Sequence, residues 1–175
     1  MEQLRILKVI IAYVFFAGII FAQQNPAISK EYSNEEITQM IKTYKTSNSR
    51  DAIPPTLLQQ RFQTDFSKAY DVEWEVAGNI YEVEFDIQDR DYKAYYHVKG
   101  NLLMYIQEIN GAELPAMVRN AAENKYPKYR LDNVDKIRRG TEVLYSVEME
   151  DKSSDLEVKL LLKDNGSILE ETFNY

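Results

Sequence analysis

Hydrophobic and polar positions repeat along this chain at an interval of about 60 residues, a length typical of one supersecondary unit. Residues 55–66 and 115–126 have the apolar spacing of an amphipathic helix. Residues 81–85 and 145–149 then alternate between apolar and polar side chains, which indicates strands with one buried face. A unit of one helix followed by strands, present twice, predicts a duplicated fold.

Each predicted helix begins at a proline, Pro55 or Pro115, a residue that the first turn of a helix tolerates. The expected buried face of the first helix, interrupted by Arg61, consists of Leu57, Leu58, Phe62 and Phe66. That of the second helix consists of Met117, Val118, Ala121, Ala122 and Tyr126. Pro127 then ends the second helix. Both helices therefore offer one apolar face for packing on a sheet.

About four strands are expected after each helix. In the first copy, Val72, Trp74 and Val76 point to one face and the acids between them to the other. Trp74 is therefore expected in the core. Asn165–Gly166, between the last two strands, is a strong hairpin signal. We predict an α+β fold, a tandem repeat of helix plus about four antiparallel strands, with the helices packed on one face of the sheet.

Residues 1–22 have the organisation of an export signal peptide. Arg5 and Lys8 precede an apolar run, residues 9–21, that is shorter than the roughly 20 residues needed to span a bilayer. Cleavage is expected near Ala22. The alternative is an uncleaved anchor, because Ile20 is bulkier than the small residue preferred three positions before the cut. The expected location of the mature chain is periplasmic or secreted.

Residues 23–51 are expected to form an N-terminal leader followed by one helix. Residues 23–33 show no periodicity, and Asn34 is the expected N-cap of the helix. Its apolar stripe consists of Ile37, Met40, Ile41 and Tyr44. The two repeats are then expected to occupy residues 52–110 and 111–175.

Cysteine content and net charge restrict the classes of function. The chain has no cysteine, which excludes disulfides, lipidation at a signal-peptide cysteine, and thiol chemistry. Its formal net charge is −7, and removal of residues 1–22 makes it one unit more negative. An acidic chain without a Lys/Arg cluster is unsuited to nucleic acid or to an anionic membrane surface. No nucleic acid is therefore expected as a partner and, after signal cleavage, no membrane.

Several short motifs together resemble a known family. They occupy residues 53–58, 66–69, 72–75 (Val-Glu-Trp-Glu) and 81–85 (Tyr-Glu-Val-Glu-Phe), and the first two recur at 114–118 and 126–129. Residues 52–173 thereby resemble the PepSY-like, β-lactamase-inhibitor-like proteins exported by Bacteroidetes-type bacteria. The resemblance implies tandem helix-plus-four-strand repeats and an extracytoplasmic location. Two departures are Ser67, where the family usually has proline, and Val134, where the second copy lacks the tryptophan.

Candidate catalytic and metal-binding residues are few. His97 is the only histidine in the sequence, so paired histidines cannot bind zinc, and a Ser-His-Asp triad would have to use this residue. Its place on the polar side of a strand favours a surface or partly packed side chain. Residues 86–91 contain three aspartates without the spacing or the glycine of a calcium loop, which favours a polar hairpin. We therefore predict no catalytic residue, no metal and no cofactor.

An acidic surface is the main candidate for binding. The polar side of two adjacent predicted strands carries Glu73, Glu75, Glu82 and Glu84. On an open sheet these carboxylates favour a solvated face, or a face for a cationic partner, over paired-carboxylate catalysis. Tyr95 and Tyr105 are expected in loops or on the polar side of strands, reflecting either interface chemistry or ordinary strand propensity. Together with His97, these residues form the candidate binding face.

Three functions remain open at this point. The favoured one is an exported, non-enzymatic binding or inhibitor-like protein whose acidic, tyrosine-bearing sheet face meets another extracytoplasmic protein. The first alternative is a structural or ligand-sensing envelope protein, and a distant alternative is an exported hydrolase. Because one fold can host many functions, the family resemblance alone does not choose among them.

Overall fold

The computed structural model of the protein describes residues 26–154 and 156–174. The predicted signal peptide, residues 1–22, lies outside the described residues. Within these residues no helix is long and apolar enough to cross a membrane.

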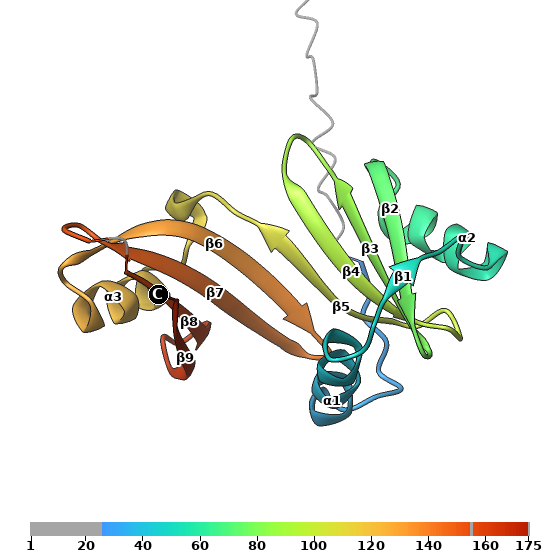
Figure 1. Ribbon diagram of the computed structural model, residues 1–175, viewed down its shortest axis with the longest axis horizontal. Helices are drawn as coiled ribbons and strands as arrows, with labels where there is room; N and C mark the ends of the chain where they lie inside the picture. Colours follow the sequence, from blue (N-terminus) through green and yellow to red (C-terminus); the bar gives the residue numbers. More distant parts are fainter. Residues whose placement is uncertain (1–25, 155, 175) are drawn as a thin grey trace, which may run out of the picture.

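The described chain folds into one antiparallel sheet accompanied by helices (Figure 1). In order, the elements are α1 (Asn34–Lys45), β1 (Arg50–Asp51), α2 (Thr56–Asp65), β2 (Tyr70–Ala77), β3 (Ile80–Asp86), β4 (Asp91–His97), β5 (Leu102–Glu108), η1 (Gly111–Glu113), α3 (Ala116–Lys125), β6 (Tyr129–Arg139), β7 (Glu142–Asp151), β8 (Glu157–Lys163) and β9 (Ile168–Asn174). The nine strands that the structure describes pair in chain order, each antiparallel to the next. The predicted α+β class is confirmed.

The two halves of the sheet share details of geometry. In Figure 1, β2–β5 lie beside α2 on the right, and β6–β9 lie with α3 on the left. The first strand of each half carries a register shift at the corresponding place, between Tyr70 and Glu73 and between Leu131 and Val134. At the first shift the backbone of Asp71 has a positive φ of 50°. Each half therefore bends at the same point of its first strand.

The N-cap of helix α1 lies one residue before the predicted one. Ser33 is the N-cap, accepting a hydrogen bond from the Glu36 backbone N–H while the Glu36 side chain accepts one from the Ser33 N–H. This reciprocal pair is a capping box, which the Ser-x-x-Glu spacing specifies, so the assignment of Asn34 was wrong by one position. The predicted stripe is otherwise confirmed, since Ile37, Ile41 and Tyr44 are buried.

Two hydrophobic clusters lie beneath α2 and α3. The α2 cluster consists of Leu58, Phe62, Phe66, Val83, Phe85, Ile87, Tyr92, Ala94, Tyr96, Leu102 and Tyr105. The α3 cluster consists of Ile109, Leu114, Val118, Ala122, Val134, Tyr145, Val147, Met149, Val158, Leu160 and Leu162. Tyr105 of the α2 cluster lies directly opposite Arg138 of β6 in the strand register. Arg138 points to the same face of β6 as Val134, which belongs to the α3 cluster. The two clusters therefore occupy the same face of the sheet, as predicted.

The buried faces of α2 and α3 are narrower than predicted. Leu57 is 56% exposed and Met117 is 61% exposed, whereas the next residues, Leu58 and Val118, are fully buried. The side chain of Leu57 covers the turn at Gly100, where an added Cβ would lie 3.4 Å from it. Both residues were wrongly assigned to the core, because neighbouring helix positions lie about 100° apart and only one of each pair can face the sheet squarely.

Trp74 packs against the α2 cluster from β2 without being fully buried. Its ring lies 5.4 Å from that of Phe62 in an edge-to-face arrangement and 6.1 Å from that of Tyr96. The face predicted for Trp74 is confirmed, but its burial is partial, because β2 has only the two-residue strand β1 on its outer side. The truncation cost is therefore expected below that of a fully enclosed aromatic residue.

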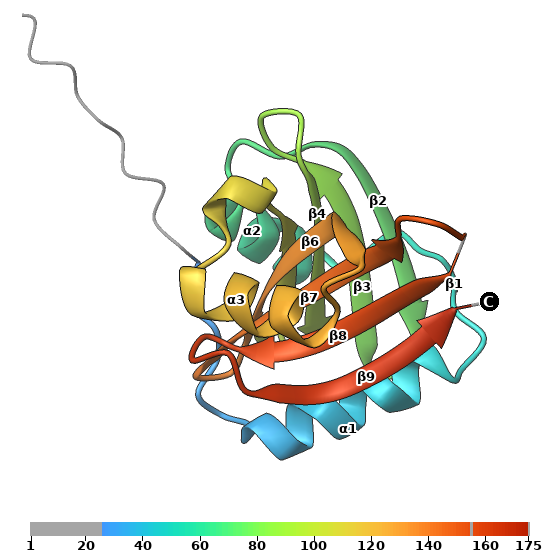
Figure 2. The same ribbon diagram turned by 90° about the vertical axis from the view of Figure 1, so that its left-hand side faces the viewer.

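Helix α1, which the sequence had assigned to neither repeat and to no face, covers the opposite face of the sheet. Its cluster consists of Ile37, Ile41, Tyr44, Ile80, Tyr95, Leu103 and Met104, with Ile106 and Ile137 packed against it. Figure 2, turned from Figure 1, shows α1 below the sheet and apart from α2 and α3. The Asn34 side chain accepts a hydrogen bond of 3.2 Å from the Thr141 backbone N–H. Helix α1 therefore contacts both halves of the sheet.

Candidate binding groove

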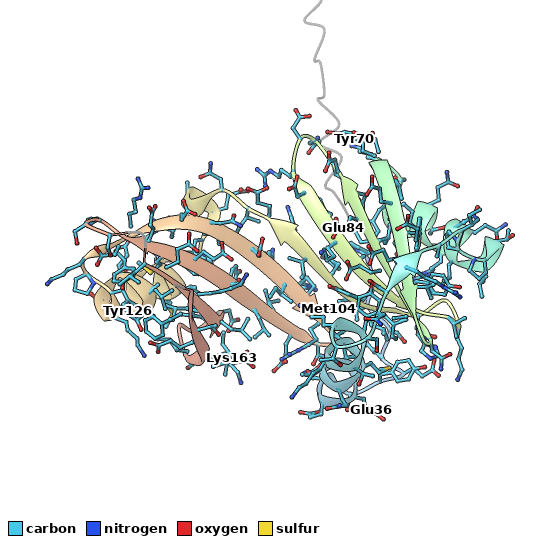
Figure 3. All side chains as sticks on the ribbon, viewed as in Figure 1. Glu36, Tyr70, Glu84, Met104, Tyr126 and Lys163 are labelled. Atoms are coloured by element: carbon cyan, nitrogen blue, oxygen red, sulfur yellow. The ribbon has the colours of Figure 1, made fainter. Side chains whose placement is uncertain are left out.

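The face of the sheet that bears α1 also contains a groove of about 700 Å³ between the two halves. Its acidic lining residues are Asp71, Glu73, Glu82, Glu84, Asp86, Asp91, Glu108 and Asp135, and its basic ones are Lys45, Lys93 and Lys159. We call this cavity the acidic groove. Glu84, labelled in Figure 3, points into the space between β2–β5 and β6–β9.

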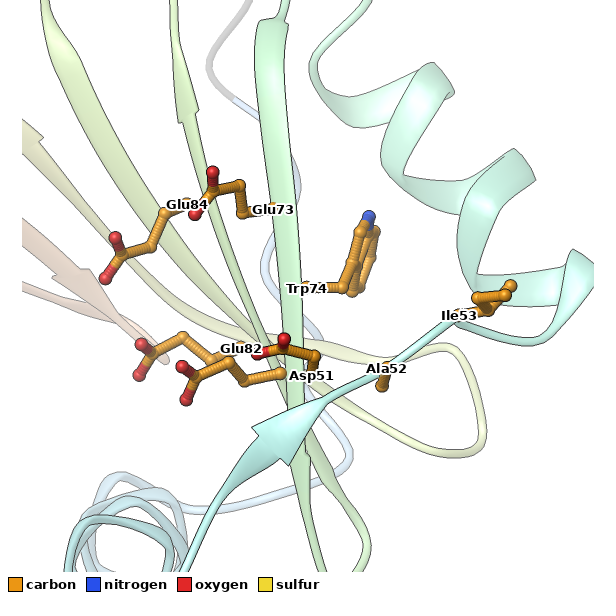
Figure 4. A pocket seen from close by; sticks show the side chains of 8 residues that line it. Asp51, Ala52, Ile53, Glu73, Trp74, Glu82 and Glu84 are labelled. Carbon is orange, nitrogen blue, oxygen red and sulfur yellow. The ribbon is translucent and has the colours of Figure 1, made fainter.

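Strand register places the glutamates of β2 and β3 together. Glu73 lies directly opposite Glu84, and Glu75 lies directly opposite Glu82. Figure 4 shows Glu73, Glu82 and Glu84 on one side of these strands and Trp74 on the other. The predicted common face for the four glutamates is therefore correct. Like charges directly opposite each other in a sheet destabilise it, so these pairs need compensation.

Lys93 on β4 compensates part of this negative charge. Its ammonium group lies 3.4 Å from the Glu82 carboxylate and also forms an ion pair with Glu84. Burial opposes the charged form of Lys93, but the hydrogen bond to Glu84 and the charges of both glutamates raise its pKa above the usual value. At the α1 end, the Tyr44 hydroxyl donates a hydrogen bond of 3.3 Å to Glu75.

Tyr95 lines the floor of the groove but is buried there. Only 1% of this residue is exposed, and its ring meets that of Tyr44 edge-on at 5.7 Å. Burial, a hydrogen bond with Glu82 and the charge of that carboxylate raise the pKa of the Tyr95 hydroxyl. Glu82 itself is 8% exposed. The predicted exposure of Tyr95 and of Glu82 was therefore wrong, because α1 covers this end of the face.

Tyr105 and His97 lie outside the groove. Tyr105 is 2% exposed and belongs to the α2 cluster, with its ring 5.7 Å from that of Phe66, so its predicted place on the polar side was wrong. His97 is 9% exposed, and its Nδ1 accepts a hydrogen bond of 3.3 Å from the Lys99 backbone N–H. Burial, followed by the charge of Lys99, lowers the pKa of His97. Of the three expected anchors, Tyr95, Tyr105 and His97, only Tyr95 lines the acidic groove, and it does so as a buried residue.

The sequence-based candidate face omitted the half of the groove that lies across the junction of the repeats. Glu108 of β5 lies directly opposite Asp135 of β6, and Lys159 of β8 pairs with Glu148 of β7 at 2.6 Å. Alternation within β5 and β6 could have assigned Glu108 and Asp135 to polar faces. It could not have brought them together, because that requires the pairing of the last strand of one repeat with the first strand of the next.

Comparison with known proteins assigns the chain to a family. Residues 31–104 and 105–170 both match the family model described as “Putative beta-lactamase-inhibitor-like, PepSY-like”. The chain belongs to this PepSY-like family. The first match includes α1, which the predicted repeat boundary at residue 52 had left outside the repeat. No curated protein matches the chain.

Several solved structures share the fold of this chain. A DUF2874 family protein from Bacteroides ovatus has a TM-score of 0.61 at 20% identity, covering 70% of this chain and 89% of that protein. A BLIP-like protein from Bacteroides fragilis has a TM-score of 0.59 at 22% identity, covering 70% and 87%. A Bacteroides eggerthii structure described as “putative periplasmic proteins” has a TM-score of 0.63 at 15% identity, covering 70% and 90%. At these identities the likeness shows the PepSY-like fold alone.

The aspartates at the β3–β4 turn are arranged as a tight hairpin. Gln88 and Asp89 both have positive φ angles, 55° and 58°, and the Ile87 and Arg90 backbones exchange hydrogen bonds across them. The Tyr70 hydroxyl donates to the Asp89 carboxylate at 2.9 Å. In residues 26–154 and 156–174, no group of three or more His, Asp or Glu side chains is placed to hold a metal ion.

We predict that this PepSY-like chain folds without a metal. Addition of a chelator such as EDTA is expected to leave its melting temperature unchanged within about 1 °C, because a metal bound only by the folded state would add stability by mass action. Differential scanning calorimetry of the protein with and without chelator measures this directly. A fall of many degrees would show that the native protein holds a metal ion and that residues 86–91 were misread as a polar hairpin.

Proposed function

We propose that this PepSY-like protein is an exported, non-enzymatic binding or inhibitor-like protein that holds a cationic segment of another extracytoplasmic protein in the acidic groove. The observation that carries the proposal is the lining of that groove, eight carboxylates against three lysines within one concave face. Family membership is consistent with a protein-binding fold, since the model that matches both halves is described as inhibitor-like.

The physical basis is electrostatic complementarity. A cationic segment entering the groove would relieve the repulsion between facing carboxylates such as Glu73 and Glu84. A cleft lined by one sign of charge also concentrates oppositely charged ligands and accelerates their association. Glu73 and Glu84 are exposed, so they are available to such a segment. Glu82 and Tyr95 would act from below, by fixing Lys93 and the groove floor.

An extracytoplasmic location is part of the same proposal. The motivation is the charged and apolar character of residues 1–22. A structural relative described as “putative periplasmic proteins” is consistent with it. Detection of the protein in the periplasmic or culture fraction, shortened by the predicted signal, tests this part independently of any binding partner.

A second cavity favours the ligand-sensing alternative. A cavity of about 480 Å³ lies between α1 and the β2–β3 turn, and its lining residues include Met40, Ile80 and His97. This mixture of apolar and hydrogen-bonding side chains is typical of small-molecule pockets. Substitution of Met40 by Trp would fill this cavity without touching the acidic groove. If a cell producing only that variant showed the same defect as a cell lacking the protein, while the variant still bound the partner, ligand sensing would be the better assignment.

The proposed function predicts a charge-dependent loss of binding. A partner is first captured from envelope extract on the immobilised protein. Glu73→Lys is then expected to weaken the complex with this partner by roughly tenfold and to reduce the salt dependence of binding. Its stability should be almost unchanged, because Glu73 is exposed and faces another carboxylate. Isothermal titration at low and high salt, with urea denaturation in parallel, measures both quantities.

Glu123→Lys is the matched control for this test. It changes the net charge equally, but Glu123 is an exposed residue of α3, outside the lining of the acidic groove. Binding by the control should equal that of the unmodified protein. If both variants bind as tightly as the unmodified protein at both salt concentrations, the acidic groove is not the binding surface and the proposal fails.

A further inference from the structure

The centre of the acidic groove, where the two repeats meet, differs electrostatically from its two sides. We call this region the seam and define it as Glu108 of β5 and Asp135 of β6, which line the groove, together with Ser146 of β7, which lies directly opposite Asp135 on the same face of the sheet. On one side Lys93 pairs with the glutamates of β3, and on the other Lys159 pairs with Glu148. Among the ion pairs of the described chain, none involves Glu108 or Asp135. The seam is therefore the part of the groove that lacks its own cation.

Register places the three seam residues side by side. Asp135 is directly opposite Glu108 on one neighbouring strand and directly opposite Ser146 on the other. Directly opposite residues of an antiparallel pair point to the same face of a sheet. Two carboxylates and one hydroxyl thus form a row of oxygen acceptors across three strands, on the face that forms the groove.

Asp135 is held in a poor environment for an unpaired carboxylate. It is partly buried, and burial is the main reason that its pKa is raised above the usual value. Lys159 acts against this shift, while the charges of Glu148 and Glu108 reinforce it. A second positive charge placed at the seam would stabilise the charged form of Asp135 and so offset the cost of burying its carboxylate.

Ser146 provides independent support. It is 5% exposed, and its Oγ has no hydrogen-bond partner among the described residues. Most buried side-chain hydroxyls are hydrogen-bonded, and leaving one unpaired destabilises the fold. A hydroxyl in this position, beside a carboxylate with no ion-pair partner, is suited to a ligand that donates hydrogen bonds and carries positive charge.

We propose that the seam is the subsite for one cationic side chain of the partner segment, and that its chemistry favours the guanidinium group of arginine. A guanidinium offers five N–H donors in a planar fork, enough to reach acceptors from more than one strand, whereas an ammonium offers three donors around a point. Charge-assisted hydrogen bonds to carboxylates are about twice as strong as neutral ones. The inference rests on the proposed function, because it specifies which group of the partner enters the groove.

The test uses a probe that does not require the natural partner. The peptide acetyl-Gly-Arg-Gly-amide is titrated into the exported, ¹⁵N-labelled protein, and amide chemical shifts are recorded by NMR. Saturable shifts centred on residues 108, 135 and 146 are expected. The same peptide with citrulline in place of arginine is nearly isosteric but uncharged, and it should produce no saturable shift.

Variants then separate the seam from a general acidic surface. Asp135→Asn and Glu108→Gln are nearly isosteric substitutions. Each should lower the affinity for the arginine peptide by roughly tenfold or more, the usual cost of losing a charge-assisted hydrogen bond. Glu123→Gln is the matched control, because it removes an exposed carboxylate of α3 that lies outside the lining of the acidic groove. It should bind the peptide as the unmodified protein does.

Ser146→Ala gives a signature that a purely structural role would not produce. Because the Oγ of Ser146 is unpaired, its removal should leave the melting temperature unchanged or raise it by roughly 2–4 °C. The same substitution should lower the affinity for the arginine peptide. Equal shifts with arginine and citrulline peptides, or equal weakening of arginine-peptide binding by Glu123→Gln and Asp135→Asn, would overturn the inference. If the natural complex still depended on Glu73 in that case, the proposed function would stand. Only the assignment of the seam as the arginine subsite would be rejected.

Discussion

Tyr95→Ala is expected to lower the free energy of unfolding by about 3–5 kcal/mol, as truncation of an enclosed aromatic side chain usually does. The residue is 1% exposed and lies in the cluster beneath α1, with its ring against that of Tyr44 at 5.7 Å. Its removal would leave a cavity between helix and sheet that the rigid strands cannot fill. Urea denaturation followed by circular dichroism measures the loss.

Tyr95→Phe is the control that separates packing from hydrogen bonding. It keeps the ring and removes the hydroxyl that bonds with Glu82, so a smaller cost of about 1 kcal/mol is expected. A loss below about 1 kcal/mol for the alanine variant would mean that α1 does not cover Tyr95 in solution. The tyrosine would then be a surface residue, as the alternation of β4 alone had suggested.

Local patterns were sufficient for the elements of this fold. The stripe from Ile37 to Tyr44 predicted α1, and the spacing after Pro55 and Pro115 predicted α2 and α3. Strand alternation placed Trp74 on the correct face of β2 and the glutamates on the other. These predictions succeeded because each depends on neighbouring residues in the chain, where side-chain direction follows directly from the period of the backbone.

The incorrect burial predictions concern which parts of the sheet are covered by a helix. Tyr95 shares the polar side of its strand with Lys93, so its alternation pattern matches that of an exposed residue. It is buried because α1 packs over that part of the sheet. This contact joins segments about 50 residues apart, and the local spacing of apolar residues carries no information about it. Tyr105 was misassigned for a different reason, because the register shift near Tyr95 alters which residues of β5 face α2.

The candidate groove was predictable only in its first half. Glu73 and Glu84 lie on adjacent strands of one hairpin, and short turns fix such pairs closely. Asp135 and Glu108 belong to different repeats, and they meet only because β5 pairs with β6 after the η1 and α3 segment. A duplicated sequence predicts two similar units, but the way the units join depends on edge pairing between them.

Ile37→Ala is the second prediction, with an expected loss of about 2–4 kcal/mol in the free energy of unfolding. Ile37 is fully buried in the cluster beneath α1, and its end also lies against Gly140, at the turn between β6 and β7. Gly140 has a positive φ of 52°, and an added side chain there would collide with the Asn34 carboxamide. The α1 contact with the second repeat is therefore close-packed, and a cavity at Ile37 weakens it directly.

The same variant should also weaken partner binding, because α1 holds the end of the acidic groove. Its Tyr44 hydroxyl bonds Glu75, and its first residue, Asn34, bonds Thr141 across the junction of the repeats. Met40→Ala is the control, since Met40 is only partly buried in the same helix and should cost about 1 kcal/mol or less. If Ile37→Ala lost stability but bound the partner as tightly as Met40→Ala, the groove would keep its shape without α1. In that case the angle between the repeats would be set by the β5–β6 pairing alone.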